Sequence, residues 1–189
     1  MTEAKVEQVI LVDELDREIG FAEKLTAHRE GALHRAFSVF VFDARGRLLL
    51  QRRAAGKYHS GGLWSNTACG HPRPGEETVS AARRRLREEM RVESELREAF
   101  GFVYRADVGG ALVEHEFDHV LVGYHAGDPA PDEAEVEAWK WIALDDLRGE
   151  LAREPEAYSV WLRLVVGSRE WRALEAKLAD RGRAEISCE

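Results

Sequence analysis

The residue types that could carry chemistry gather in two short segments. In TACGHPRPG, Cys69 lies two residues before His71, and in VEHEF, Glu114 and Glu116 are also two residues apart. Side chains two apart on a strand project to the same face, about 7 Å apart along the backbone. We therefore expect the two carboxylates to share one environment. A thiol, an imidazole and paired carboxylates can act as metal ligands, acids or bases.

The face that carries the two carboxylates also carries apolar side chains. Leu112, Val120 and Val122 have the same parity as Glu114 and Glu116. A carboxylate within a partly apolar row needs a partner for its charge. Two interpretations stay open at this point: a sheet face that is solvated at one end, and a metal or catalytic site.

A third carboxylate belongs to a predicted helix. Apolar residues recur at three- and four-residue spacing over 78–91, which indicates an amphipathic helix. At about 100° per residue, Glu89 falls beside the apolar stripe, whereas Glu88 points away from it. Glu89 is therefore expected to face the sheet, and an ordinary ion pair with Arg85 one turn earlier is the competing explanation.

Three histidines lie near the predicted ends of elements: His28, His34 and His71. Each one alone fits a surface or capping histidine. Together with Glu114 and Glu116 they form a set of three imidazoles and two carboxylates. Such a set suits Zn²⁺ or Mn²⁺ better than Ca²⁺.

The elements that must position these groups indicate one α+β domain with a mixed sheet. Strands are predicted at 9–12, around Ile19, and at 37–42, 48–52, 63–68, 100–105, 111–124 and 137–142, and helices at 21–27, 78–91, 145–151, 156–166 and 168–179. The segments 37–42 and 48–52 are predicted to form a hairpin. Because Gly and Pro surround Cys69, we expect this residue in a turn.

Composition limits the class of partner. The net charge of −8 disfavours nucleic acid, and we expect no membrane span, no secretory signal and a cytoplasmic location. Cys69 and Cys188 are far apart in the sequence, and Cys188 belongs to a polar tail, so Cys69 is expected to be a free thiol. Two basic clusters, around Arg53 with Lys57 and around Arg84, fit either a solvated surface or a small anionic ligand.

Several motifs together resemble a known family. Gly70-x5-Glu76-x7-Arg84-x-Leu86-x-Glu88-Glu89-x2-Val92 is similar to the Nudix box, except that Arg85 replaces a glutamate and Arg91 replaces a glycine. These two departures fit another branch of the Nudix superfamily, the type 1 isopentenyl-diphosphate isomerases. Four further segments resemble the same branch: LHRAF at 33–37, WSNTACGHP at 64–72, Tyr104-Arg105 and VEHE at 113–116. The resemblance extends from Val9 to Val166, which sets a domain at 1–166 and leaves 167–189 as an unassigned C-terminal helix and tail.

The resemblance implies a Nudix-type mixed sheet flanked by helices, and an enzyme that interconverts isopentenyl and dimethylallyl diphosphate for isoprenoid synthesis. It implies catalytic roles for Cys69, Glu116, Tyr104 and Trp161. A Mn²⁺ or Zn²⁺ ion would be held by His28, His34, His71, Glu114 and Glu116, and a substrate-bound Mg²⁺ by Glu89 and the carbonyl of Cys69. Substrate contacts would come from Lys24, Arg53, Lys57, Arg85 and Trp64.

Two other functions stay open on the sequence alone. One is a Mg²⁺-dependent Nudix hydrolase of a nucleoside diphosphate derivative, with Glu88 and Glu89 activating water. The other is a sensor that binds a diphosphate and does not turn it over. All three alternatives share a small-molecule diphosphate as the partner, without nucleic acid or membrane, and none of them predicts the oligomeric state.

Overall fold

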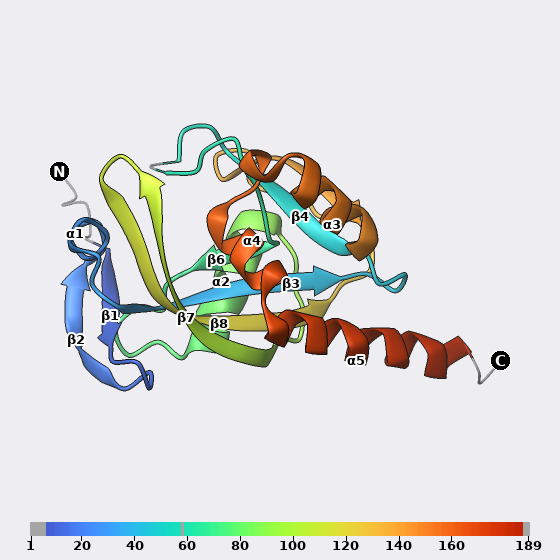
Figure 1. Cartoon of the computed structure of the whole chain (residues 1–189), viewed down its shortest axis with the longest axis horizontal. Helices are drawn as coiled ribbons and strands as arrows, with labels where there is room; N and C mark the ends of the chain where they lie inside the picture. Colours follow the sequence, from blue (N-terminus) through green and yellow to red (C-terminus); the bar gives the residue numbers. More distant parts are fainter. Residues whose placement is uncertain (1–6, 58, 187–189) are drawn as a thin grey trace.

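The computed structural model describes residues 7–57 and 59–186. Figure 1 shows a curled mixed sheet with helices on both of its faces and one helix extending from the body. Among the described residues, no helix is both long and apolar enough to span a membrane. The described strands form one continuous sheet of nine strands, as expected for an α+β domain.

Strand β3 (His34–Phe42) lies at the centre of the sheet. Strand β8 (Leu112–Tyr124) runs parallel to it along its whole length, and β7 (Arg97–Gly109) pairs antiparallel with β8. The predicted Gly-Gly turn joins β7 to β8, with positive φ at Gly109 and Gly110. Long alternating strands with a glycine turn are a local signal, so the sequence predicted this hairpin correctly.

The two strands predicted at 37–42 and 48–52 are present, but they pair with each other only beside the turn that joins them. Strands β3 and β4 (Leu48–Arg53) share a single residue pair, Phe42 with Leu48. The Thr67 hydroxyl accepts from the backbone N–H of Val41 at 2.9 Å and donates to the carbonyl of Leu49 at 2.7 Å. A segment distant in sequence therefore separates the two strands, and β4 pairs instead with β5 (Trp64–Ser65) and β9 (Val136–Ile142).

Cys69 lies in a strand and not in the predicted turn. Residues Ala68–Gly70 form β6, which pairs antiparallel with β3 so that Cys69 faces Ser38. The pairing partner comes from thirty residues earlier, which local Gly and Pro content does not reveal. His71 follows directly after this strand.

The N-terminal elements form a small unit beside the β7–β8 hairpin (Figure 1). Strands β1 (Gln8–Val12) and β2 (Glu18–Glu23) pair with each other, and β1 contacts β3 through Leu11 and His34. Helix α1 spans Lys24–Glu30, where Glu23 caps its N-terminus. The helix predicted at 21–27 therefore begins three residues late in the structure, because 21–23 complete β2.

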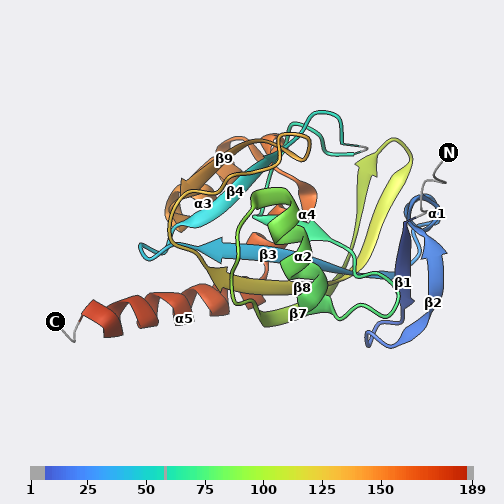
Figure 2. The same ribbon diagram turned by 180° about the vertical axis from the view of Figure 1, so that it is seen from behind.

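Helices cover both faces of the sheet. Helix α2 (Thr78–Met90) packs on one face around Leu86 and Met90, as Figure 2 shows from behind. Helices α3 (Leu144–Arg153), α4 (Val160–Gly167) and α5 (Arg169–Ile186) belong to the other side, where Trp171 packs against Phe40. The helix predicted at 156–166 begins at Val160, since Pro155–Ala157 is a single 3₁₀ turn. Cys188 lies outside the described residues.

Candidate functional site

Strand register places three polar side chains side by side. Glu116 of β8 is the direct neighbour of His34 on β3 and of Tyr104 on β7. Directly paired residues point to the same face of a sheet, and all three side chains are buried. The sheet therefore supplies a row of imidazole, carboxyl and phenol groups without any loop flexibility.

Four potential metal ligands converge at one end of this row. One ligand atom from each of His28, His34, His71 and Glu116 lies within 4.8 Å of the others. His71 Nε2 is 2.9 Å from Glu116 Oε1 and 3.2 Å from His34 Nε2. Helix α1, strand β3, the segment after β6 and strand β8 each contribute one member.

Backbone carbonyls orient two of these imidazoles. His28 Nδ1 lies 2.7 Å from the carbonyl of Lys24, and His34 Nδ1 lies 2.8 Å from that of Ala32. A carbonyl only accepts, so the proton is assigned to Nδ1 in both rings and Nε2 presents a lone pair. This is the tautomer that metal-binding histidines need.

Burial favours the neutral forms of His28 and His71. Burial lowers the pKa of His71 to about 4, although Glu116 opposes the shift, and burial together with His34 lowers the pKa of His28. Neutral imidazoles with inward lone pairs and an adjacent carboxylate fit a divalent transition metal. The donor set is therefore chemically suited to the ion that the sequence predicted.

Glu114 lies in a neighbouring group and not in the first one. Its ligand atoms cluster within 4.8 Å of those of His28 and His59. His59 Nε2 is 3.3 Å from Glu114 Oε1, and His28 belongs to both groups. The predicted set of three histidines and two glutamates is thus assembled as two overlapping clusters with His59 as an additional member.

The Tyr104 hydroxyl connects the two carboxyl groups. It lies 2.6 Å from Glu116 Oε2 and 2.8 Å from Glu114 Oε2. Because burial raises the pKa of Tyr104 well above its usual value, the phenol keeps its one proton. One proton cannot serve two ionised carboxylates, so one carboxyl must carry the second proton.

The environment of the two carboxyl groups differs. Burial and repulsion from Glu116 raise the pKa of Glu114 well above its usual value. Burial would also raise the pKa of Glu116, but the His34 and His71 imidazoles outweigh that effect and hold it well below its usual value. Tyr104 therefore donates to an ionised Glu116 and accepts from a protonated Glu114.

Cys69 lines the same cavity as these groups. The cavity has a volume of about 220 Å³, and its walls include Cys69, Tyr104, Glu116 and Trp161. Drug-sized ligands occupy pockets of roughly 300 to 1,000 Å³, so this one suits a smaller molecule. Burial raises the pKa of Cys69 to about 12 despite the nearby Arg53, which keeps the thiol protonated.

The two predicted tryptophans are placed differently. Trp161 is buried, lines the cavity and donates from Nε1 to Asn66 Oδ1 at 2.9 Å. Trp64 is not among the residues that line this cavity; its ring lies 4.6 Å from the Lys140 ammonium instead. Its predicted contact with substrate is therefore not supported by this arrangement.

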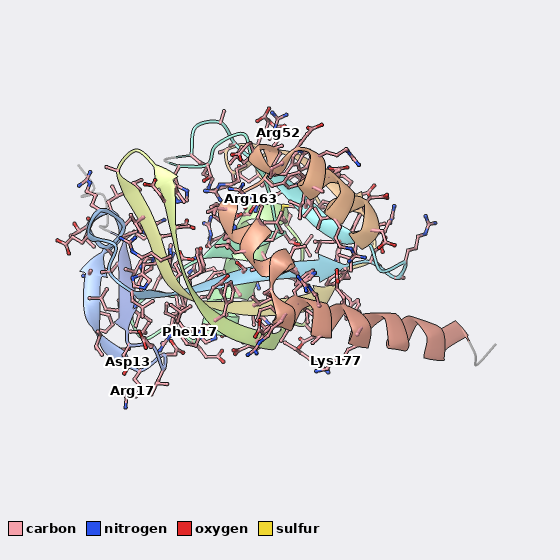
Figure 3. The ribbon with its side chains drawn as sticks, viewed as in Figure 1. Asp13, Arg17, Arg52, Phe117, Arg163 and Lys177 are labelled. Atoms are coloured by element: carbon pink, nitrogen blue, oxygen red, sulfur yellow. The ribbon has the colours of Figure 1, made fainter. Side chains whose placement is uncertain are left out.

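All four predicted cationic residues reach the cavity. Lys24, Arg53, Lys57 and Arg85 line it together with Glu89. Arg52 belongs to the same basic segment but is exposed on the outer surface, as Figure 3 shows. Alternation along β4 thus directs only Arg53 inward.

Glu89 is buried, as its helical position predicted, while Glu88 is half-buried. Glu89 Oε1 accepts from Arg85 Nη2 at 2.5 Å, and Glu89 Oε2 accepts from Gln51 Nε2 at 2.7 Å. The ion pair with Arg85 and the placement toward the sheet therefore occur together and were not true alternatives.

The charges around the cavity nearly balance. Five cationic side chains and five glutamates line it; they are Lys24, Arg53, Lys57, Arg84 and Arg85, and Glu7, Glu89, Glu114, Glu116 and Glu135. With Glu114 protonated, the five cations face four ionised glutamates. A diphosphate would make the total charge of this set negative. A divalent cation would offset that charge, which is consistent with a metal-dependent anion site.

Sequence reasoning missed His59 and Glu135. Glu135 pairs with Lys57 and with Arg85, whose Nη2 is 3.3 Å away, so it holds two of the cavity cations. Glu135 belongs to an acidic loop in which no single carboxylate stands out, and His59 to a glycine-rich loop. The segment KYHSG, with a histidine two residues after Lys57, was the available signal.

Comparison with known proteins identifies the family. The protein family described as "NUDIX domain" matches residues 32–164 of this chain. "Isopentenyl-diphosphate Delta-isomerase 2" of Aromatoleum aromaticum is 62% identical, with 82% of each chain covered. The "Isopentenyl-diphosphate Delta-isomerase" of Burkholderia multivorans is 58% identical and covers 85% of this chain and 91% of its own. The protein of that name from Serratia proteamaculans is 50% identical and covers 85% of this chain and 89% of its own.

Solved structures agree at the level of the fold. A protein from Deinococcus radiodurans has a TM-score of 0.66 at 22% identity and covers 78% of this chain and 90% of its own. A C. elegans Ap4A hydrolase has a TM-score of 0.54 at 19% identity, covering 76% and 98%. The chain has the Nudix fold and belongs, within the Nudix superfamily, to the isopentenyl-diphosphate Delta-isomerase family.

Proposed function

We propose that this protein interconverts isopentenyl diphosphate and dimethylallyl diphosphate in isoprenoid biosynthesis. The observation that carries the proposal is that a half-buried thiol and a buried carboxyl–phenol pair line one small cavity, with an aromatic ring and a set of cations beside them. The reaction moves a double bond and breaks no bond to phosphorus.

The reaction needs two proton-transfer groups. One adds a proton to the terminal alkene carbon, which leaves a tertiary carbocation, and the other removes a proton from the carbon on the diphosphate side. Cys69 and Glu116 are the proposed pair, with Tyr104 hydrogen-bonded to Glu116 at 2.6 Å. One group loses the proton that it held and the other gains one, so a solvent exchange completes each turnover.

Trp161 is proposed to stabilise the carbocation. An aromatic face attracts positive charge by about 0.5 to 2 kcal/mol and offers no nucleophile. The guanidinium of Arg53 already lies 5.2 Å from this ring, so the ring interacts with a cation in this environment. The buried side chains of Trp161, Tyr104 and Glu116 on this wall of the cavity also limit the access of water to the cation.

Two divalent cations are proposed as cofactors. Mn²⁺ or Zn²⁺ would be held by His28, His34, His71, Glu116 and Glu114, and the carbonyl contacts of His28 and His34 support this assignment. Mg²⁺ would be held by Glu89 and the carbonyl of Cys69. When bound, the cations supply positive charge that orders the carboxylates and offsets the diphosphate. Lys24, Arg53, Lys57 and Arg85 would bind the remaining phosphate oxygens.

We also propose a cytoplasmic location. Cys69 forms no disulfide in the structure, and a catalytic thiol suits a reducing compartment.

The decisive experiment follows deuterium. Wild-type protein incubated with isopentenyl diphosphate and Mg²⁺ in deuterated water should yield dimethylallyl diphosphate labelled in a methyl group. Cys69→Ala should abolish the label while near-UV circular dichroism stays unchanged. Release of inorganic phosphate would indicate a hydrolase, and binding of isopentenyl diphosphate by the wild type without any turnover would indicate a sensor; either result would refute the proposal.

A further inference from the structure

His59 is buried although it belongs to a surface loop. The loop 54–63 joins β4 to β5, and backbone hydrogen bonds between Arg53 and Leu63 and between Gly62 and Arg53, both 2.9 Å, close its base. His59 is 8% exposed, whereas Gly61 on the same loop is exposed. The loop therefore turns one imidazole inward to the cavity.

The contacts of His59 lead directly to the metal-ligand groups. Its Nε2 lies 3.3 Å from Glu114 Oε1, and its ring meets Trp161 edge-on with the centroids 5.8 Å apart. Its carbonyl accepts from Arg53 Nη2 at 3.5 Å, and its Nδ1 contacts Ser60 Oγ at 3.2 Å. Tyr104 occupies the other oxygen of Glu114, at 2.8 Å. His59 and Tyr104 thus hold the Glu114 carboxyl group from both sides.

The same loop carries a substrate-binding cation. Lys57, two residues earlier, lines the cavity and pairs with Glu135. The loop 54–63 therefore contacts the metal-ligand end of the cavity through His59 and the diphosphate end through Lys57. No other described element contributes both a histidine to the two ligand clusters and a lysine to the cavity wall within three residues.

We propose that His59 is a positioning residue that couples metal occupancy to the loop 54–63: its Nε2–H orients Glu114 toward the cation, and the oriented Glu114 in turn fixes the loop that presents Lys57. This inference rests on the metal site of the proposed function. A neutral imidazole is suited to the task, because it donates a hydrogen bond without adding charge that would repel a cation. Residues that orient metal ligands in this way typically change metal affinity by about 10- to 100-fold.

Two substitutions separate the hydrogen bond from the packing. His59→Phe keeps a ring against Trp161 and removes the donor, and His59→Gln keeps a donor and removes the ring. Ser60→Ala is the matched control, because it removes only the contact to Nδ1. The binding of the first equivalent of Mn²⁺ is measured for each protein from the electron paramagnetic resonance signal of free Mn²⁺.

We expect His59→Phe to raise the Mn²⁺ dissociation constant by about 10- to 100-fold. His59→Gln should restore affinity to within a few-fold of wild type, and Ser60→Ala should leave it unchanged. Equal affinity in wild type and His59→Phe, or failure of His59→Gln to restore it while the fold is intact by circular dichroism, would overturn the proposal.

Hydrogen exchange tests the coupling itself. Mn²⁺ loading of EDTA-treated wild-type protein should slow exchange of the amides in 54–63 by roughly tenfold, as expected for one hydrogen bond to a charged group. The same loading should leave this loop unchanged in His59→Phe at saturating Mn²⁺. Equal slowing in both proteins would overturn the coupling alone, whereas wild-type protein that binds no Mn²⁺ would overturn the metal site of the proposed function as well.

Discussion

Tyr104→Phe tests the row of polar groups across β7, β8 and β3. The substitution removes a single oxygen atom that lies 2.6 Å from Glu116 and 2.8 Å from Glu114. The shorter contact is in the range of charge-assisted O–H···O⁻ bonds, roughly 2.5 to 2.7 Å. A hydrogen bond to a charged group contributes about 1.5 to 3 kcal/mol. If that bond acts in the transition state, kcat falls by about 10- to 150-fold.

The expected change lies in kcat and not in KM. Two of the cations proposed to bind diphosphate, Lys57 and Arg85, pair with Glu135, whereas the Tyr104 hydroxyl bonds Glu114 and Glu116. Substrate affinity should therefore stay within about twofold of wild type, whereas kcat and kcat/KM should fall together. Initial rates would be followed as conversion of radiolabelled isopentenyl diphosphate to the acid-labile dimethylallyl product.

Tyr158→Phe is the matched control for this measurement. Its hydroxyl also bonds a carboxylate, that of Glu150, but neither residue lines the cavity. This variant should keep wild-type kcat, with at most a small loss of stability. A Tyr104→Phe enzyme with wild-type kcat, or one that loses only affinity, would refute the reasoning that Tyr104 acts through Glu116.

Three further outcomes are expected. Lys57→Ala should raise KM about tenfold or more and leave kcat nearly unchanged in steady-state kinetics, because Lys57 is proposed to bind the diphosphate, which does not react. An equal loss in kcat would contradict this role. In EDTA, the imidazole resonances of His71 and His59, followed by NMR as pH decreases from about 6.5 to about 3, should stay those of neutral rings until well below the usual histidine range, because burial lowers the pKa of His71 to about 4 and of His59 to about 3; rings that titrate near 6.5 would contradict their burial. Mn²⁺ at 100 times its dissociation constant should add about 2.7 kcal/mol and raise the melting temperature by roughly 5 to 10 °C, whereas an unchanged midpoint in scanning calorimetry would indicate that no site is formed.

Local patterns in the sequence predicted the elements with short-range contacts. The β7–β8 hairpin and the α2 helix follow from alternation, a glycine turn and helical spacing, and the burial of Glu89 follows from its angle on that helix. The metal-ligand assignment depended on the family resemblance, and the structure brought His28, His34, His71 and Glu116 together.

Long-range pairing accounts for what the sequence did not reveal. The strand that contains Cys69 exists because it pairs with β3, and Thr67 separates β3 from β4 through two side-chain hydrogen bonds. Neither effect has a local signature. His59 was overlooked for the same reason, since its partner Glu114 is more than fifty residues away and a glycine-rich loop usually indicates only a surface connection.

The strand position of Cys69 divides the walls of the cavity into a stationary part and a part able to move. The sulfur is carried by backbone that is hydrogen-bonded to the central strand, so it keeps its position through a catalytic cycle. Entry of substrate and departure of product must then depend on segments outside the sheet core, and the connection at 54–63 is one that reaches both ends of the cavity. If product release limits the rate, substitutions in 54–63 would change kcat even though they leave the reacting groups unchanged.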